Sequence, residues 1–230
     1  MTCALVVPAA GRGERLGAGL PKALVPLAGE PLLVHALRRA LASGVVDVVV
    51  VVAPEGRQEH VRALLGPLGA ADVRVVAGGA ERQDSVRCGL AALPPGVDVV
   101  LVHDAARCLT PPAVFRAVVA AVRGGAVAVV PVLPVSDTVK RVAGDVVLET
   151  VDRRELVAVQ TPQGFDPAPL RAAHEAARGA TGAAPATDDA GMLEALGHRV
   201  RTVPGDDTAF KVTRPVDLVL AEALLSGGRA

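Results

Sequence analysis

Small residues and three cations crowd the segment "PAAGRGERLGAGLPKAL", which runs from Pro8 to Leu24. Where side chains are small, backbone N–H groups can approach a ligand closely, and such concave stretches of backbone bind anions. Arg15 and Lys22 would add positive charge, so the segment suits a polyphosphate. A glycine turn beside solvated cations accounts for the same residues equally well, and the choice depends on other parts of the chain.

Two familiar phosphate-binding motifs are absent from this segment. A dinucleotide-binding G-x-G-x-x-G would need a third glycine after Gly11 and Gly13, but Leu16 stands there. A Walker P-loop needs glycine before its lysine and Ser or Thr after it, whereas Lys22 follows a proline and precedes an alanine. The first failure also disfavours a nicotinamide-dependent oxidoreductase.

The segment "VDVVLVHDAARCL" ends an apolar run with His103 and Asp104. If that run is a parallel strand, both residues lie at the carboxyl edge of the sheet, where open α/β sheets bind ligands. A single carboxylate suits Mg²⁺, which commonly takes one or two carboxylates together with substrate phosphate oxygens. Asp104 as a helix N-cap or turn residue is the alternative. His103 is expected to be a hydrogen-bonded residue of the core.

Two further segments carry polar residues at expected strand ends. "AGGAERQDSVRCGL" has a Gly-Gly pair before an expected helix, so Ser85 could contact a nucleobase edge, although helix capping explains the same residues nearly as well. "FKVTRPVDL" carries Lys211 on an expected strand directly before a helix whose Pro215 suits its first turn. Lys211 matters for chemistry only if the fold brings it beside the first loop.

The elements that would position these residues alternate along the chain. Continuous valine-rich runs, typical of parallel strands covered on both faces, occupy residues 4–8, 46–52, 72–76, 97–103 and 126–132. Segments with helical spacing of apolar residues lie at 31–43, 56–69, 82–93 and 111–125. The alternation predicts a doubly wound α/β fold in three layers. Helices are also expected at 187–197 and 214–226, with strands at 198–205 and 209–213.

The pattern changes after residue 133, where two strand-like segments flank "AGD" and no helix follows until residue 166. This predicts a hairpin arm at about residues 134–158, projecting from a single domain of residues 1–230. Because so small an arm cannot bury its own faces, we expect it to pack on a second subunit. The alternative is a surface hairpin folded back on its own domain.

Composition excludes several classes of protein. The 24 basic and 24 acidic residues balance, and the chain has three Phe and no Trp or Tyr, so a nucleic-acid-binding surface is not expected. Three cysteines without a CxxC pair suit reduced thiols in the cytoplasm. Neither a signal peptide nor a membrane span fits the apolar runs.

Eight short motifs together resemble those of the 2-C-methyl-D-erythritol 4-phosphate cytidylyltransferase family, over about residues 4–225. They are "PAAGRGERLGAGLPK", "GGAERQDSV", "HDAAR", "DTVKR", "TVDR", "QTPQ", "TDD" and "KVTRPVDL". The resemblance implies a Rossmann-like three-layer α/β/α nucleotidyltransferase fold with a mostly parallel sheet and a projecting β-arm. It also implies an enzyme that moves a cytidylyl group from CTP to a sugar-alcohol phosphate, with Mg²⁺ as cofactor and a homodimer formed through the arm.

The resemblance further implies a role for each matching position. The implied catalytic cations are Arg15, Lys22 and Lys211, and the implied metal ligand is Asp104. The implied nucleotide contacts are Ala9, Ala10, Gly11, Gly79 and Ser85. The implied acceptor contacts are Arg107, Thr138, Arg153 and Thr161, of which Thr138 and Arg153 lie on the arm and would reach a partner's site. Thr187 and Asp188 also match, but capping explains them equally well, and Arg12 is expected to face solvent.

Three departures from the family pattern affect the surroundings of the site: Cys108 stands where proline is common, Ala80 where an acidic residue is common, and Ala209 where asparagine is common. The nearest rival function is a cytidylyltransferase for a pentitol phosphate such as ribitol 5-phosphate. "TVDR" and "QTPQ" favour methylerythritol phosphate. A non-catalytic nucleotide-binding regulator would share the fold, but Lys22, Asp104 and Lys211 favour an enzyme.

Overall fold

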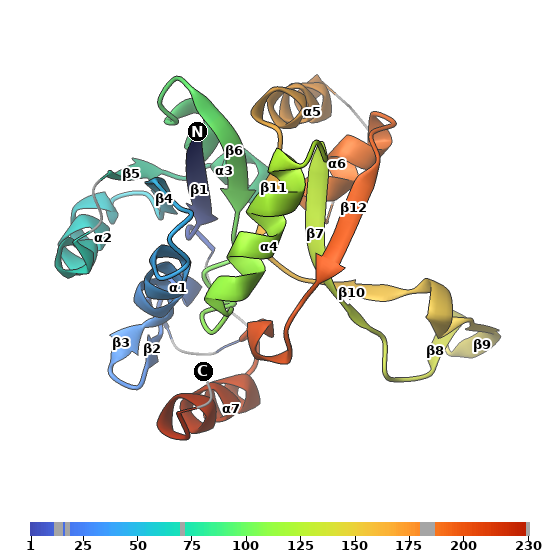
Figure 1. Ribbon diagram of the computed structural model, residues 1–230. Coiled ribbons are helices and arrows are strands. Elements are labelled where there is room, and N and C mark those ends of the chain that lie inside the picture. The colour runs from blue at the N-terminus through green and yellow to red at the C-terminus, as the bar shows by residue number, and fades with distance from the viewer. Residues whose placement is uncertain (12–15, 17–18, 70–71, 180–186, 229–230) are drawn as a thin grey trace.

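The computed structural model of the 230-residue chain describes residues 1–11, 16, 19–69, 72–179 and 187–228. Its centre is an eight-stranded sheet in the order β10-β7-β11-β6-β1-β4-β5, with β12 paired to β7 (Figure 1). These strands are β1 (Thr2–Pro8), β4 (Val48–Ala53), β5 (Val73–Ala77), β6 (Val97–Val102), β7 (Ala128–Pro134), β10 (Val157–Val159), β11 (Gln163–Phe165) and β12 (Val200–Pro204).

The sheet is mostly parallel, as predicted. β1 pairs in parallel with β4 and β6, β4 with β5, and β7 with β12. The short strands β10 and β11 are antiparallel to their neighbours, and β11 lies between β6 and β7. Because β11 is antiparallel to both, β6 and β7 run in the same direction, and the parallel strands end at one common edge.

Helices cover both faces of the sheet, because successive residues of a strand point to opposite sides. Leu5 and Val7 of β1 belong to a core shared with α1 (Leu32–Leu41), α2 (Gln58–Leu65) and α4 (Pro112–Arg123). Ala4 and Val6 belong to a second core shared with α3 (Arg82–Ala91), α5 (Pro167–Gly179) and α6 (Asp189–Ala195). The predicted three layers are confirmed.

A third apolar cluster lies under the last helix, α7 (Pro215–Ser226). It joins Leu27, Leu32, Leu109, Val212 and Ala221. Between β1 and α1 the chain forms the 3-10 turn η2 (Lys22–Leu24) and two short strands, β2 (Pro26–Leu27) and β3 (Glu30–Pro31). The cluster thus fixes the start of α7 against the segment that carries Lys22.

A two-stranded arm extends away from the sheet, made of β8 (Val139–Ala143) and β9 (Val146–Val151) (Figure 1). Its end is followed by the 3-10 turn η4 (Arg153–Glu155) and by β10, which returns to β7. Val142, Val146, Val147 and Leu148 are each more than half exposed. The arm therefore presents apolar side chains that its own domain does not cover.

The predicted strand at residues 209–213 is wrong. The chain there forms the 3-10 turn η5 (Asp207–Ala209) and then runs extended to α7 without joining a sheet. Val212 makes one hydrogen bond from its N–H to the carbonyl of Ala106, at 2.8 Å. A strand needs a continuous ladder of such bonds, and the apolar spacing alone did not distinguish the two cases.

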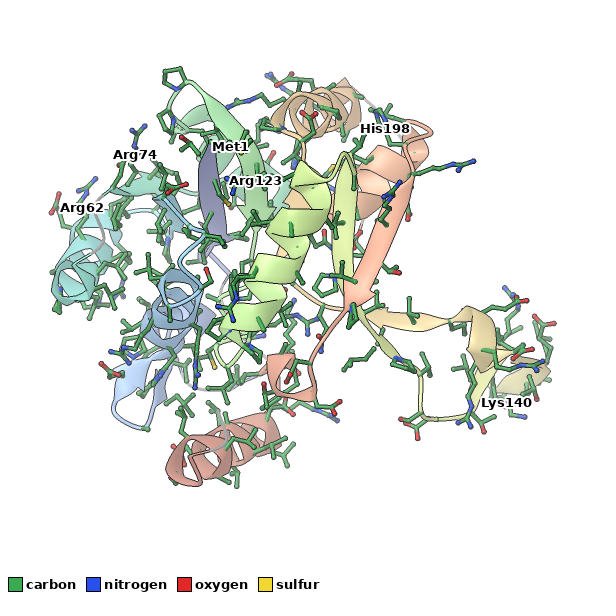
Figure 2. The ribbon with its side chains drawn as sticks, viewed as in Figure 1. Met1, Arg62, Arg74, Arg123, Lys140 and His198 are labelled. Carbon is green, nitrogen blue, oxygen red and sulfur yellow. The ribbon has the colours of Figure 1, made fainter. Side chains whose placement is uncertain are left out.

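Several ion pairs involve cations that Figure 2 labels. Arg62 pairs with Glu59, Arg74 with Asp72, and Arg123 with Asp98. Lys140, on the arm, donates to the Thr150 hydroxyl at 2.6 Å. Among the described residues, no helix is long and apolar enough to span a lipid bilayer.

Candidate active site

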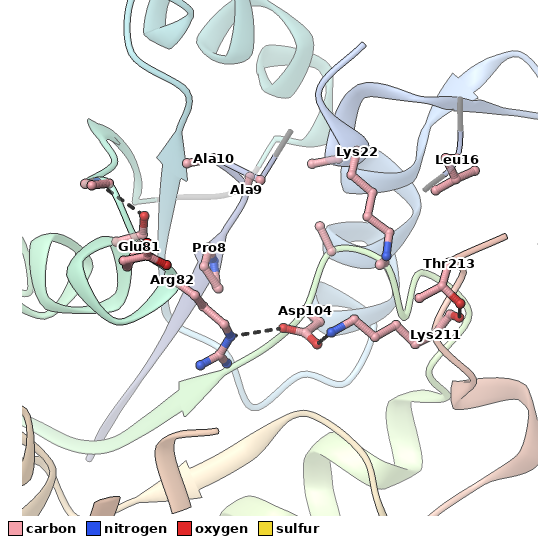
Figure 3. A pocket seen from close by; sticks show the side chains of 17 residues that line it. Pro8, Ala9, Ala10, Leu16, Lys22, Glu81, Arg82, Asp104, Lys211 and Thr213 are labelled. Atoms are coloured by element: carbon pink, nitrogen blue, oxygen red, sulfur yellow. Dashed lines mark hydrogen bonds and ion pairs between the residues drawn. The ribbon is translucent and has the colours of Figure 1, made fainter. Parts of the chain in front are cut away.

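One cavity of about 420 Å³ lies at the carboxyl edge of the sheet, where β1, β4, β5 and β6 end. The residues that line it come from parts of the chain that lie far apart in the sequence (Figure 3). They are Pro8, Ala9, Ala10, Gly11, Leu16, Lys22, Ala23, Gly79, Ala80, Glu81, Arg82, Ser85, Asp104, Ala105, Ala106, Lys211 and Thr213. The fold therefore brings together most of the residues that we predicted from the sequence to take part in catalysis or binding.

The first loop contributes backbone and one described cation to the cavity. Ala9, Ala10 and Gly11 follow β1 directly, and Ala9 N–H donates to the Val52 carbonyl at 2.8 Å. Lys22 N–H donates to the Gly11 carbonyl at 3.1 Å, so the two ends of the loop meet. Arg12 and Arg15 lie outside the described residues. The roles expected for these two arginines stay predictions.

The loop between β5 and α3 leaves no room for side chains at Gly78 and Gly79. A Cβ on Gly78 would lie 2.6 Å from the Ala10 Cβ, and one on Gly79 would lie 2.3 Å from the Asp84 Cβ. The Gly-Gly pair therefore lets the start of α3 approach the first loop. The Ser85 side chain is buried, and its hydroxyl accepts from Gly79 N–H at 3.3 Å. Its hydroxyl hydrogen can be donated to a ligand in the cavity.

Asp104 lies between two cations in the cavity (Figure 3). Lys211 Nζ is 2.7 Å from Asp104 Oδ2, and Arg82 Nε is 3.7 Å from Asp104 Oδ1. Burial by itself would raise the pKa of Asp104, but Lys211 and Arg82 outweigh it and lower the pKa to about 2. Asp104 is therefore ionised at neutral pH. Lys211, which matters for chemistry only if the fold brings it beside the first loop, does reach the site.

The backbone of Asp104 is held from behind by Thr161. The Thr161 hydroxyl accepts from Asp104 N–H at 3.1 Å and lies 2.9 Å from Nδ1 of His103. Thr161 does not line the cavity, so its described contacts support Asp104 rather than an acceptor. His103 is fully buried, its ring packs edge to face on Phe115 at 5.0 Å between ring centres, and burial lowers its pKa to about 4. His103 is therefore a neutral core residue, as expected.

The glutamines of "QTPQ" tie neighbouring segments to the sheet edge. Gln160 donates to the Asp206 carbonyl at 2.8 Å and accepts from Asp206 N–H at 3.0 Å. Gln163 donates to Asp188 Oδ2 at 2.6 Å and accepts from Ala190 N–H at 3.2 Å. Asp188 also caps α6 by accepting from Gly191 N–H. The capping interpretation of "TDD" is therefore confirmed for Asp188.

Arg107 is not among the residues that line the cavity. Its guanidinium donates to the Ala209 carbonyl at 2.7 Å and to the Val159 carbonyl at 3.1 Å. Burial lowers its pKa, and its Nε has no hydrogen-bond partner among the described residues. In this structure Arg107 joins the base of the arm to the segment before Lys211. An acceptor contact by Arg107 stays a prediction.

The arm residues also lie away from the cavity of their own chain. Thr138 is exposed just before β8, and Arg153 is exposed at the start of η4, where its guanidinium contacts the Ser136 carbonyl. Neither residue lines the cavity. Their predicted contact with an acceptor, in a partner's site, stays a prediction.

Sequence reasoning missed Arg82, a cation in the cavity. Arg82 stands within "GGAERQDSV", three residues before Ser85. Its Nη2 lies 2.8 Å from Oδ2 of Asp189, a fully buried carboxylate on α6. The position of Arg82, first in a helix after a Gly-Gly turn, could have indicated that its side chain faces the sheet edge.

The donor set at this site fits Mg²⁺ with a nucleotide. Among the described residues, no group of three or more His, Cys, Asp or Glu could hold a metal ion. The described side chains alone therefore do not form a complete metal site. Asp104 offers ionised, hard oxygen atoms, and Mg²⁺ typically combines one or two carboxylates with substrate phosphates. Asp104 is the described residue that would hold the ion.

Comparison with known proteins identifies the family. The model of the family described as 2-C-methyl-D-erythritol 4-phosphate cytidylyltransferase, IspD, matches residues 3–227. The chain belongs to this family. A cytidylyltransferase of that name from Saccharopolyspora erythraea is 55% identical, over 98% of this chain and 100% of the relative. One from Streptomyces avermitilis is 54% identical, over 98% and 92%.

Solved structures of the cytidylyltransferase family share the fold. The Thermus thermophilus enzyme has a TM-score of 0.79 at 39% identity, over 98% of this chain and 100% of that one. The Anaerococcus prevotii 4-diphosphocytidyl-2C-methyl-D-erythritol synthase has a TM-score of 0.85 at 26% identity, over 98% of each chain. The resemblance seen in the motifs is thus confirmed over residues 3–227 of the cytidylyltransferase chain.

Proposed function

We propose that this protein transfers the cytidylyl group of CTP to 2-C-methyl-D-erythritol 4-phosphate. The products are 4-diphosphocytidyl-2-C-methyl-D-erythritol and pyrophosphate, in the non-mevalonate route to isoprenoid precursors. One observation carries the proposal: Lys22, Asp104 and Lys211, far apart in sequence, meet in one cavity beside small-residue loops. Membership of the cytidylyltransferase family gives that cavity its substrates.

The reaction requires positioning and charge stabilisation more than proton transfer. The phosphate of the acceptor has a second pKa near about 6, so it is largely a dianion at neutral pH and needs no general base. Its oxygen attacks the α-phosphorus of CTP, the bond to the β-phosphate oxygen breaks, and pyrophosphate leaves with the electron pair. The protein must bring two anions together and stabilise the charge that develops.

The cations of the cavity are suited to that work. Lys22 would contact the triphosphate and the departing pyrophosphate, together with Arg15. Lys211 would face the α-phosphate, and to do so its ammonium exchanges the Asp104 oxygen, 2.7 Å away, for a phosphate oxygen. Lys211 is 40% exposed at its side chain, so this exchange needs no repacking of the core.

Bound Mg²⁺ would neutralise phosphate charge, and Asp104 would hold it. The cytosine would lie against Ala9, Ala10, Gly11 and Gly79, with the Ser85 hydroxyl donating to a base-edge acceptor. Small residues on both loops leave room for a flat ring. Most of that recognition would come from backbone groups, which explains why the loop sequences specify the base only weakly.

We further propose a cytoplasmic homodimer in which the arm completes the site of the partner subunit. The exposed apolar residues of the arm support association. The acceptor phosphate would then be bound by Arg153 and Thr138 of the arm, with Arg107 at its base. Guanidinium groups suit a phosphate dianion because they donate two parallel hydrogen bonds. Thr161 would contribute by holding Asp104.

Pyrophosphate release tests the substrate assignment. Purified protein with Mg²⁺ and CTP should release pyrophosphate only after 2-C-methyl-D-erythritol 4-phosphate is added. Ribitol 5-phosphate, tested side by side at equal concentration, should give much slower release. Equal or faster turnover with ribitol 5-phosphate would overturn the acceptor, and release without any acceptor would overturn the transfer reaction itself.

A further inference from the structure

Arg82 connects the cavity to a carboxylate inside the protein. Its Nε lies 3.7 Å from Oδ1 of Asp104, which lines the cavity, and its Nη2 lies 2.8 Å from Oδ2 of Asp189 (Figure 3 shows the first contact). The contact with Asp189 is an ion pair without hydrogen-bond geometry. Burial opposes the charge of Arg82, but the two carboxylates more than offset it, so the pKa of Arg82 is raised.

Asp189 is sealed from solvent and does not line the cavity. Its exposed fraction is 0%, and its second oxygen, Oδ1, accepts from Nε2 of His174 at 3.1 Å. The side chain of His174 on α5 is only 2% exposed. A buried carboxylate is costly unless it is paired, so Asp189 holds Arg82 firmly, with His174 behind it.

The guanidinium suits this arrangement because its nitrogens point in different fixed directions and can face two carboxylates at once. The second partner of Asp104 is Lys211, whose ammonium is expected to turn to the α-phosphate during the reaction. Arg82 has no such freedom, since α3 and Asp189 fix both of its ends. When Lys211 leaves, Arg82 is the cation that still orients Asp104.

We propose that Arg82 is a positioning residue for the transfer reaction: anchored by Asp189, with His174 behind it, Arg82 holds the Asp104 carboxylate in the orientation that transfer requires. The proposal rests on the proposed function of the cavity. It assigns Asp189, which cannot touch a substrate in the cavity, an effect on catalysis through Arg82.

If the role of Arg82 is purely structural, a different result is expected. If Arg82 only neutralises the buried Asp189, removing both charges together should restore the fold and the activity alike. The double variant Arg82→Gln/Asp189→Asn removes the buried charge and leaves no unpaired carboxylate. Melting temperature, affinity for CTP by calorimetry, kcat and both KM values would be measured for it.

We expect the double variant to melt close to the wild type and to bind CTP within about threefold, while kcat falls at least about tenfold. A matched control, Arg123→Gln/Asp98→Asn, removes an ion pair of the same types, at 3.0 Å, away from the cavity. Its kcat should stay at the wild-type value. Recovery of kcat to within about twofold in the Arg82/Asp189 double variant would overturn the proposal.

Arg82→Lys provides a second test if the double variant does not fold. Lysine keeps the charge that Asp189 needs, but a single ammonium cannot face both carboxylates as the guanidinium does. The positioning role predicts a folded protein with reduced kcat and little change in the KM for CTP. Wild-type kcat in Arg82→Lys would overturn the proposal. Wild-type protein is assayed in parallel, so failure of the proposed function itself shows as absent turnover in that sample.

Discussion

The charge and orientation of the Asp104 carboxylate are set by the residues around it. A lone carboxylate at a strand end can be a helix cap, a turn residue or a metal ligand. Here its side chain is 13% exposed, and Lys211 and Arg82 lower its pKa to about 2. These contacts keep it charged and aimed into the cavity.

Replacing this charge tests its role directly. Asp104→Asn keeps the shape and removes the negative charge, so we expect kcat for cytidylyl transfer to fall by about a hundredfold or more. Steady-state kinetics measures the loss, and circular dichroism checks the fold. Asp47→Asn is the matched control, because Asp47 accepts a hydrogen bond from Cys3 N–H at 2.8 Å near the start of β4. Activity of Asp104→Asn near that of the control would contradict the role.

His103 makes a prediction about stability and pH. Burial lowers its pKa in the folded protein to about 4, below the ordinary value of 6.5 expected after unfolding. Between these values the unfolded chain binds the proton more readily, so the free energy of unfolding should fall as the pH drops from about 6.5 to about 4. Melting curves across that range should show a smaller loss for His103→Gln than for the wild type. Parallel curves for the two proteins would argue against a neutral, buried His103.

Individual residues differ in how far the sequence predicted them. Asp104 follows the end of β6, and Lys22 begins η2 after the loop that leaves β1, so the rule that parallel strands end at one edge predicts that these two meet. Lys211 lies on a segment outside the sheet, so that rule does not place it. The pair of Arg82 with Asp189 depends on how α3 and α6 pack over the sheet. Packing of that kind leaves no periodic pattern in the sequence, so Arg82 was missed as a partner of Asp104.

At the scale of elements, burial explains which strands were predicted. β4 is a continuous apolar run, and β6 is one apart from Asp98, because helices cover both faces of the sheet. β10 and β11 are three residues each and follow no such pattern, so they escaped prediction. The strand predicted before α7 is the opposite case. "AFKVT" has the composition of a strand but makes only one backbone hydrogen bond to Ala106.

The arm is the element whose function is most open to a test. Because Arg153 is exposed and lies outside the cavity of its own chain, its proposed partner is the acceptor phosphate in the neighbouring subunit. We expect Arg153→Ala to raise the KM for the acceptor at least about tenfold and to leave the KM for CTP within about twofold. The neighbouring Arg154→Ala serves as control, since Arg154 pairs with Asp152. An equal effect on both substrates would argue against acceptor binding by Arg153.

At the scale of the whole molecule, an arm that completes a partner's site predicts complementation between inactive subunits. Arg153→Ala and Lys211→Ala would each impair every site of their own homodimers. After mixing and subunit exchange, half of the dimers would be hybrids with one intact site, so activity should rise to about a quarter of the wild-type value. Sedimentation would verify that the mixture is dimeric. Activity that stays at the level of the separate variants would place both residues in one subunit's site.

Phosphorus NMR of a single reaction tests the central claim that the acceptor phosphate attacks the α-phosphorus of CTP in this cavity. The sample would contain the protein, Mg²⁺, CTP and methylerythritol phosphate with ¹⁸O in its phosphate group. The account predicts equal amounts of pyrophosphate without ¹⁸O and of a cytidine diphosphate diester whose bridging oxygen carries the label. Label in the pyrophosphate, or cleavage of CTP without a diester product, would contradict it.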